Sequence, residues 1–170
     1  NKFCIQNNVW DFFLKSLAGF LLLGLLLPFV TPDVFAADNT SEFAGGSGTA
    51  NDPYLIATKE QLNNVRNHLD AHFRMIKSFS LEESDFSEGG IFYNDGCGWL
   101  PIGADETMPF TGVFNGSENA ISGLRMKSDS NNTATAYLGL FGYSTGKISN
   151  LQLIDSEFSS SSPNCVIGSI

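Results

Sequence analysis

The chain has 170 residues, with 18 acidic and 9 basic side chains, and a formal net charge of −9. This length allows one domain with a substantial core. The basic residues are scattered singly, so the clustered cations that bind a phosphate backbone are missing, which argues against nucleic acid as a partner. Only Cys97 and Cys165 lie beyond the leader; a disulfide between them is one alternative, but two cysteines do not make a disulfide framework.

Residues 1–36 have the pattern of a secretory signal peptide. An apolar run from Leu17 to Val30 is preceded by Lys2 and Lys15 and followed at 34–36 by Val-Phe-Ala, which fits the small-residue rule for cleavage. A membrane anchor is the alternative, but a spanning helix needs about 20 apolar residues and this run contains Pro28. We therefore expect a secreted or cell-surface protein with no membrane segment after signal cleavage.

Residues 37–50 are small, polar and glycine-rich, and predict a flexible lead-in. The glycines at 45–48 lack the Gly-Lys-Ser/Thr ending of a phosphate-binding loop. Residues 51–109 are expected to form an N-terminal cap region. Within it, Asn51-Asp52-Pro53 predicts a turn that leads into a short strand at Tyr54-Leu55-Ile56.

One helix is predicted in the cap region, over residues 59–72. It begins with a capping box, in which the Thr58 hydroxyl accepts from the backbone N–H of Gln61 while the Gln61 side chain reaches back. An apolar stripe at helical spacing follows, formed by Leu62, Val65, Leu69 and Phe73. A helix ahead of a strand-rich repeat region is typical of a cap that covers the open end of a stacked core.

No metal or other cofactor is expected. His68 and His72 stand four residues apart, but the zinc-protease pattern needs Glu directly after the first His, where this chain has Leu69, and no third ligand is evident. The acidic segment 82–85 lacks the spacing of an EF-hand loop, so calcium is only a weak alternative there. Asp105 and Glu106 are adjacent carboxylates, which on a loop usually face water rather than perform acid/base chemistry.

Residues 110–170 contain a repeat. The segments 110–114 and 121–126 read Phe-Thr-Gly-Val-Phe and Ile-Ser-Gly-Leu-Arg-Met, and return 27 residues later as Tyr-Leu-Gly-Leu-Phe and Ile-Ser-Asn-Leu-Gln-Leu. A third copy begins at 166–170 as Val-Ile-Gly-Ser-Ile, at a spacing of 29 from 137–141. A displacement shared by separate blocks marks units that stack on copies of themselves.

The apolar residues of each copy come in short pieces separated by Gly, Asn and Ser, which favours strands over helices. A single copy cannot bury its apolar face, whereas stacked copies share one core. The sequence therefore predicts a mainly β fold, a right-handed parallel β-helix or a related β-solenoid with an N-terminal capping α-helix. Phe114 is predicted to lie under Phe141, and Ile121 under Ile148. The predicted repeat core consists of Phe110, Gly112, Val113, Phe114, Ile121, Leu124, Met126, Tyr137, Gly139, Leu140, Phe141, Gly142, Ile148, Leu151 and Leu153.

The segment Gly139-Leu140-Phe141-Gly142, followed by Ile148-Ser149-Asn150-Leu151, resembles the GLUG repeat of exported bacterial surface proteins. The ordered segments 45–56, 61–62, 99–103 and 110–116 resemble the lead-in of such proteins. The resemblance implies a repeat module of a large, adhesin-like exported protein. In some proteins of this kind the repeat accompanies a zinc peptidase of the IgA-cleaving type, but the metal-binding sequence of that peptidase is absent from this chain.

Catalysis on a groove of stacked strands would need an aligned column of carboxylates, and Glu118 has Thr145 at its 27-residue equivalent. We therefore expect a non-catalytic structural or adhesive surface module that continues into further repeats. Its partner would be a host, matrix or cell-surface protein or glycan. The alternatives are a carbohydrate-active β-helix protein and the accessory region of a secreted zinc peptidase. An open strand edge also predicts that the segment 37–170 is marginally stable or prone to aggregate.

Overall fold

The computed structural model describes residues 41–128, 136–161 and 164–168. The predicted signal peptide, residues 37–40 of the predicted lead-in and residues 169–170 of the third copy lie outside this described part. Residues from Glu42 onward belong to one compact unit. Its fold is mainly β, and the pairings between its named strands are parallel, as the repeats predicted.

The predicted flexible lead-in is wrong for residues 42–50, which pack against the first strand, β1 (Tyr54–Ile56). Phe43 is only 4% exposed, and its ring stacks on Tyr54 with 4.3 Å between centroids. The backbone N–H of Leu55 donates to the carbonyl of Gly45 at 2.8 Å. At Gly46 a Cβ would lie 1.9 Å from the carbonyl oxygen of Pro53, so the glycine allows this close contact between the two segments.

The predicted helix begins where expected but ends early. Helix α1 spans Lys59–Asn64 and continues as a 3-10 helix over Val65–Asn67. Half of its predicted capping box forms, because the Thr58 hydroxyl accepts from the backbone N–H of Gln61 at 3.3 Å. Oε1 of Gln61 reaches back one residue further and accepts from the backbone N–H of Ala57 at 2.8 Å rather than from that of Thr58. Leu62 and Val65 of the predicted stripe are fully buried.

The predicted helical stripe fails after Asn67, because Phe73 lies in strand β2 (His72–Met75). Phe73 is held between two parallel neighbours, Tyr54 of β1 and Phe114 of β4. Pairing on both sides gives its backbone N–H and C=O groups partners that a helix would otherwise supply. Tertiary pairing has therefore overridden the local helical pattern.

A short strand β3 (Phe79–Ser80) and two 3-10 helices, Glu83–Asp85 and Asn94–Gly96, follow β2. Asp85 is a buried carboxylate, and its Oδ1 lies 2.5 Å from Nζ of Lys59. Its Oδ2 also accepts from the backbone N–H of Glu82 at 2.8 Å. The acidic segment 82–85 is thus tied to helix α1 through Asp85, while its other three residues are exposed.

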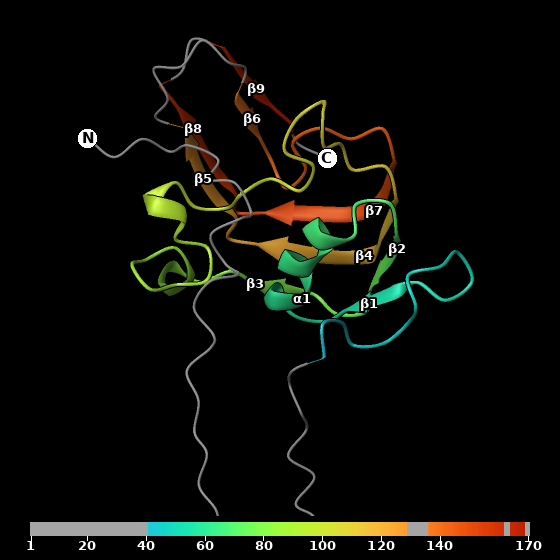
Figure 1. Ribbon diagram of the computed structural model, residues 1–170. Helices are drawn as coiled ribbons and strands as arrows, with labels where there is room; N and C mark the ends of the chain where they lie inside the picture. Colours follow the sequence, from blue (N-terminus) through green and yellow to red (C-terminus); the bar gives the residue numbers. More distant parts are fainter. Residues whose placement is uncertain (1–40, 129–135, 162–163, 169–170) are drawn as a thin grey trace, which may run out of the picture. The chain divides into compact units, whose positions relative to one another are not determined.

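Two successive sets of three strands carry the repeat region, and each strand of the second set pairs with one of the first (Figure 1). We call the first set the middle layer and the second set the last layer. The middle layer consists of β4 (Val113–Ser122), β5 (Arg125–Ser128) and β6 (Ala136–Leu138). The last layer consists of β7 (Lys147–Ile154), β8 (Glu157–Ser160) and β9 (Cys165–Ile167).

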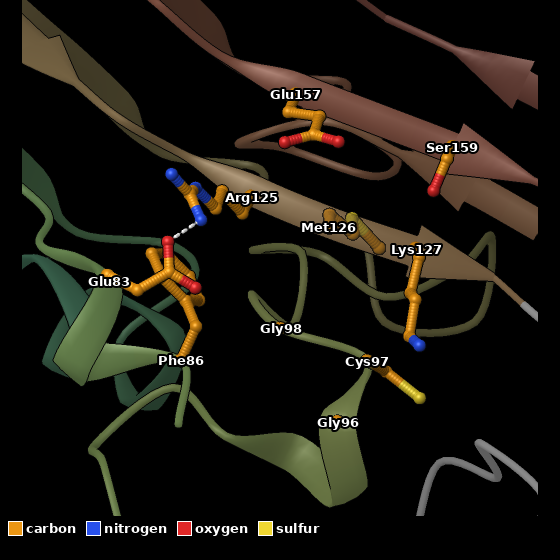
Figure 2. Close-up of a pocket in the computed structure, with 10 residues that line it drawn as sticks. All are labelled: Glu83, Phe86, Gly96, Cys97, Gly98, Arg125, Met126, Lys127, Glu157 and Ser159. Carbon is orange, nitrogen blue, oxygen red and sulfur yellow. Dashed lines mark hydrogen bonds and ion pairs between the residues drawn. The ribbon is translucent and has the colours of Figure 1, made fainter.

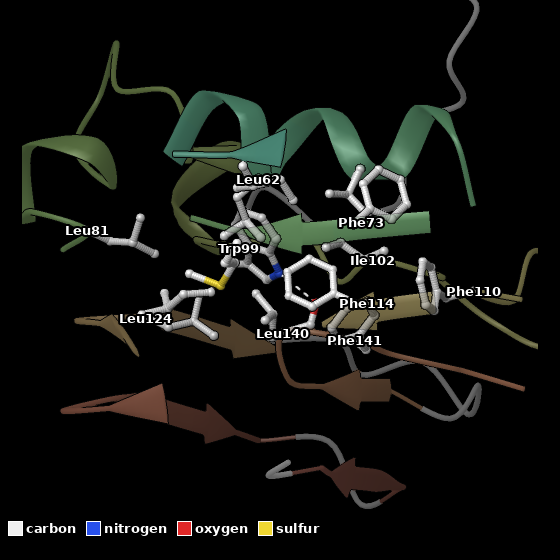
Figure 3. Close-up of a cluster of buried hydrophobic side chains, with 14 of the residues drawn as sticks. Leu62, Phe73, Leu81, Trp99, Ile102, Phe110, Phe114, Leu124, Leu140 and Phe141 are labelled. Carbon is white, nitrogen blue, oxygen red and sulfur yellow. Dashed lines mark hydrogen bonds between the residues drawn. The ribbon is translucent and has the colours of Figure 1, made fainter. Parts of the chain in front are cut away.

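The core collects large side chains from many of these segments (Figure 3). The Phe73 ring lies 6.3 Å from that of Phe114 between centroids, and the Phe114 ring lies 5.4 Å from that of Phe141. Trp99 is fully buried, and its indole Nε1 donates to the carbonyl of Leu140 at 3.1 Å. The bond gives the N–H of the buried indole the partner that a buried Trp usually has.

Arg66 lies against this core. Its guanidinium carbon is 4.9 Å from the centroid of the Trp99 ring, a cation–π distance. Its Nε donates to the carbonyl of Asn63 at 3.0 Å. Burial lowers the pKa of Arg66 to about 10, which still leaves the side chain charged at neutral pH.

Candidate functional site

The predicted repeat-core residues fall into two groups in the structure. The first group is buried: Phe110, Gly112, Phe114, Ile121, Leu124, Gly139, Leu140 and Phe141. The second group is half-buried: Val113, Met126, Tyr137, Gly142, Ile148, Leu151 and Leu153. The strand residues of the last layer, Ile148, Leu151 and Leu153, all belong to the half-buried group, so the layers differ in how well they are covered.

The predicted stacking is wrong in its register for Ile121. In the ladder between β4 and β7, Ile121 pairs with Leu153 and not with Ile148. Phe114 pairs with Ile148, and it meets Phe141 through its ring rather than through the ladder. The strand partners therefore lie further along the chain than the 27-residue repeat indicates.

A bulge in β4 accompanies this difference. The register shifts between Asn115 and Asn119, so that β4 carries more residues across this stretch than β7 does. Ser117 and Glu118 inside the bulge have φ angles of 50° and 62°, a left-handed conformation. The repeat in the sequence has a constant spacing of 27 residues across this stretch. The strand pairing of β4 with β7 does not keep that spacing.

The third copy pairs as its sequence match predicted. Tyr137 pairs with Val166, and Leu138 pairs with Ile167, between β6 and β9. The paired residues differ in burial, because Leu138 is 1% exposed and Ile167 is 56% exposed. The same position in two consecutive layers is therefore buried in one and open in the other.

The last layer presents an open surface, which we call the end face and define by its exposed apolar residues, Ile154, Val166 and Ile167. Their exposed fractions are 43%, 50% and 56%. Among the described strands, β7 pairs only with β4, β8 only with β5, and β9 only with β6. The outer edges of the three strands thus carry backbone groups without a strand partner in the described part of the chain.

Glycines mark where consecutive layers touch through their backbones. A Cβ on Gly112 would lie 2.1 Å from the carbonyl oxygen of Ala71, and one on Gly146 would lie 2.2 Å from that of Gly112. A Cβ on Gly139 would lie 2.8 Å from the carbonyl oxygen of Gly168. For Gly168 itself no atom lies within 4 Å of the added Cβ. Three of these glycines are therefore needed for packing that the structure shows, and Gly168 is not.

Asparagine side chains bridge the same two layers beside the bulge. Nδ2 of Asn150 donates to Oδ1 of Asn115 at 3.2 Å, and the backbone N–H of Ser117 donates to the same oxygen at 2.9 Å. Asn150 has a φ of 53°, a conformation that Asn tolerates better than most residues. Asn150 belongs to β7 of the last layer and is exposed.

A pocket of about 210 Å³ opens where the 83–98 segment meets β5 and β8 (Figure 2). Arg125 forms an ion pair with Glu83 across it, and Glu157 stands opposite Arg125 in the ladder. The pocket is lined by Glu83, Phe86, Gly96, Cys97, Gly98, Arg125, Met126, Lys127, Glu157 and Ser159. Two carboxylates and two cations leave the lining without net charge, so the pocket has no preference for ions of one sign.

Sequence reasoning did not find this pocket. Gly98 and Met126 both line the pocket. Gly98 has a φ of 80° and forms an antiparallel bridge with Met126. The charges that line the pocket come from segments far apart in the chain. The only local signal was the alternation of Arg125, Met126 and Lys127, which places both cations on one face of a strand.

The two histidines do not converge on a site. Nε2 of His68 lies 2.9 Å from Oε1 of Glu42, while the backbone N–H of His72 donates to the carbonyl of Gly48. Within residues 41–128, 136–161 and 164–168 no three metal-ligating side chains of His, Cys, Asp or Glu come together. The weak calcium alternative at 82–85 is further limited because Asp85 is engaged by Lys59.

The adjacent carboxylates Asp105 and Glu106 have separate surroundings. Oδ1 of Asp105 accepts from Oγ1 and the backbone N–H of Thr107 at 2.6 and 2.7 Å, and from the backbone N–H of Met108 at 3.2 Å. These hydrogen bonds lower the pKa of Asp105 and make it a turn-forming residue. Partial burial raises the pKa of Tyr137, and the charge of Glu106 raises it further.

The alternative of a disulfide between Cys97 and Cys165 is not realised. Cys165 lies at the start of β9 and carries a free thiol. Cys97 is buried beside the pocket.

Comparison with known proteins gives two relatives of much greater length. The chain is 37% identical over 141 residues to a protein of Evansella cellulosilytica named "Putative Gly-rich membrane protein"; the match covers 81% of this chain and 15% of that protein. It is 34% identical over 113 residues to Halomucin of Haloquadratum walsbyi, covering 64% of this chain and 1% of that protein. No protein-family profile and no solved structure matches the chain. Among the described residues, no helix is long and apolar enough to span a bilayer.

Proposed function

We propose that the chain is the N-terminal part of an exported bacterial repeat protein and acts as a non-catalytic structural or adhesive surface module. The observation that carries this proposal is the pairing of two successive layers, strand by strand, around a shared apolar core. Such layers are added one upon another in repeat proteins, whose extended surfaces serve for binding.

The architecture we propose is a parallel β-solenoid of the GLUG-repeat type. Parallel pairing of β4 with β7, β5 with β8, and β6 with β9 supports this interpretation. So does the contribution of Leu62 and Val65 from helix α1 to the same core. The closing of the layers into a continuous coil, and the role of α1 as its cap, are parts of this proposal.

A cell-surface location is supported by three features. The leader has the pattern of a signal peptide, and the acidic composition suits an exported protein. The relatives are named a Gly-rich membrane protein and a Halomucin. We propose that the partner is a host, matrix or cell-surface protein or glycan, and that the module continues into further repeats.

A carbohydrate-active enzyme would need carboxylates aligned across layers. Glu118 lies in the bulge of β4, and in the described ladders the carboxylate that does pair, Glu157, stands opposite Arg125. Incubating the chain with acidic and neutral polysaccharides, with and without Ca²⁺, tests this alternative. Measurable cleavage would overturn the non-catalytic proposal. A zinc-peptidase accessory role would instead require a zinc-binding helix encoded elsewhere in the protein.

Export can be tested by fusing residues 1–170 to a reporter enzyme that is active only outside the bacterial cytoplasm. The fusion should give reporter activity and remain accessible to protease on intact cells. The matched control carries Leu22→Arg and Leu25→Arg, which interrupt the apolar run and should abolish export. Equal activity of the two fusions, or none from the unaltered one, would contradict an exported module.

A further inference from the structure

We infer that the outer edge of β7, β8 and β9 is a docking edge for one further β layer, parallel to the last layer and supplied by the same polypeptide in a longer protein. This inference rests on the proposed function and adds to it the residues that receive the layer. Three independent features of the end face carry it: its exposed apolar side chains, an unexplained glycine and an asparagine at the end of a side-chain ladder.

One exposed apolar side chain, Ile167, stands at a ladder position that is buried one layer earlier. Leu138, which has β9 beside it, is 1% exposed, and its ladder partner Ile167 is 56% exposed. Val166 and Ile154 of the same layer are also exposed. These residues belong to strands whose outer edges have no strand partner in the described part of the chain. A strand placed beside β9 would lie next to Ile167 as β9 lies next to Leu138.

Gly168 indicates that the backbone of the following layer passes close to the end of β9. Its counterpart one layer earlier is Gly139, where an added Cβ would lie 2.8 Å from the carbonyl oxygen of Gly168. At Gly168 no atom lies within 4 Å, and its φ is outside the left-handed region. Neither space nor backbone conformation therefore requires glycine at this position in the structure. A backbone carbonyl of a following layer, at the distance seen for Gly139, would require it.

Asn150 provides a polar partner for the same layer. Its Nδ2 donates to Asn115 in the layer before, while its side chain is exposed on the outer side. The asparagine side chain has an NH₂ group that donates and an oxygen that accepts. Nδ2 of Asn150 donates to the preceding layer, so Oδ1 of Asn150 can accept from a following layer. An Asn or Ser of the incoming layer would continue this ladder.

The glycine contacts also give the direction of the incoming layer. Gly112 packs on the carbonyl of Ala71, and Gly146 packs on the carbonyl of Gly112, so the same corner contact advances by one layer in one direction. A second copy that docked its own end face here would run its strands antiparallel and would break this column. The matched stretch also occupies only 15% of the Evansella relative, which leaves ample chain there for more layers. The occupant is therefore a layer of the same polypeptide.

The test adds a layer to the full chain. The sequence match puts Ile170 at the position of Phe141, so a second copy of residues 142–170 can be appended directly after Ile170 in register. A control carries the same appended residues in scrambled order. Hydrogen exchange should show backbone amides of β7, β8 and β9 protected about tenfold or more over the control, because they gain a strand partner. No gain over the scrambled control would overturn the inference.

Gly168→Val makes the test specific for the proposed contact. In the unextended chain this substitution should leave exchange and unfolding unchanged, because nothing lies near the added side chain. In the extended chain it should remove most of the gained protection. Gly139→Val serves as the control, and it should destabilise both the unextended and the extended chain, because the added side chain meets the carbonyl oxygen of Gly168. A gain that survives Gly168→Val would overturn the assignment of this glycine.

Two further outcomes are distinguishable. If the unextended chain forms a dimer in sedimentation experiments and its β7, β8 and β9 amides are already protected, a second copy occupies the end face and the inference is wrong. Failure of the reporter fusion to be exported would instead overturn the proposed location, whatever the exchange experiment shows. The docking edge and the surface function are thus tested separately.

Discussion

The middle layer and the last layer share one backbone plan and differ in burial. Both consist of three strands, and their strands pair one to one. In the middle layer Phe114, Ile121 and Leu138 are buried, whereas their partners in the last layer are half-buried or exposed. The side chains at these positions are apolar in both layers, so composition does not account for the difference.

The difference shows that burial in this fold depends on having a layer on each side. A residue of the middle layer lies between the strands before it and the strands after it, while a residue of the last layer has one such neighbour in the described structure. In repeat architectures stability is a sum over units and the interfaces between them. The interface between the middle and last layers therefore stabilises both, and the end face contributes little until it is covered.

The largest expected effect comes from truncating the two members of one ladder pair. Leu138→Ala should lower the free energy of unfolding by about 2–5 kcal/mol, because it leaves a cavity where a side chain is 1% exposed. Ile167→Ala removes a side chain that is more than half exposed and should cost less than about 1 kcal/mol. Urea denaturation of both variants measures the difference. Equal losses would mean that the end face is already covered in solution.

Gly112 and Gly168 allow a second comparison between a covered position and an open one. Gly112→Ala places a methyl group 2.1 Å from the carbonyl oxygen of Ala71, so backbone must shift, at a cost of about 1–3 kcal/mol. Gly168→Ala meets no atom within 4 Å and should be neutral or slightly stabilising, by up to about 1 kcal/mol. Thermal unfolding of the two variants beside the parent provides the measurement. A loss at Gly168 equal to that at Gly112 would contradict the open end face.

An ion pair ties helix α1 to the 83–85 turn, on a part of the core away from the end face. Asp85→Asn should lower the free energy of unfolding by about 1–2 kcal/mol, because the Asp85 side chain is 6% exposed while Lys59 retains 27% exposure and is partly screened. Lys59→Met combined with Asp85→Asn should recover part of this loss. Urea denaturation of the single and double variants provides the test. A double variant less stable than the sum of both single losses would contradict a direct pair.

The pH dependence of this pair has a defined sign. The hydrogen bond from Lys59 to Asp85 raises the pKa of Lys59 above its ordinary value of 10.5. A raised folded-state pKa contributes stability that is fully present below the unfolded pKa and is lost as the pH rises through the folded pKa. The gap between the parent and Asp85→Asn should therefore shrink as the pH rises above 10.5. A gap that stays constant over this range would assign the stabilisation to packing alone.

Local patterns in the sequence predicted the elements that depend on neighbours in the chain. The Thr58 hydroxyl caps the backbone N–H of Gln61 as predicted, and Leu62 and Val65 of the predicted stripe are buried. Parallel strands were also predicted from the repeat. These features are set by side chains within a few residues of one another, or by a period that the sequence displays directly.

Features that depend on distant segments were not predictable in the same way. Phe73 continued the helical stripe in sequence, but its position between Tyr54 and Phe114 makes it a strand residue. The register of Ile121 against Leu153 depends on the bulge at 115–119, which no period reveals. The pocket beside Arg125 requires segments that only the folded chain brings together. The exposure of the end face likewise depends on which strands lie beside it in the folded chain, since Leu138 and Ile167 are both apolar in sequence but differ in burial.

The smallest expected effect concerns the asparagine bridge between the two layers. Asn150→Ala removes the hydrogen bond to Asn115 and replaces a residue at positive φ, so a loss of about 0.5–1.5 kcal/mol is expected at this exposed site. Asn150→Gly removes the same hydrogen bond but accepts the backbone conformation, which separates the two contributions. Urea denaturation of both variants should rank Asn150→Ala below Asn150→Gly in stability. If the two variants lose equally, the side-chain bridge accounts for the whole effect, and the link between layers depends on the amide rather than on the turn.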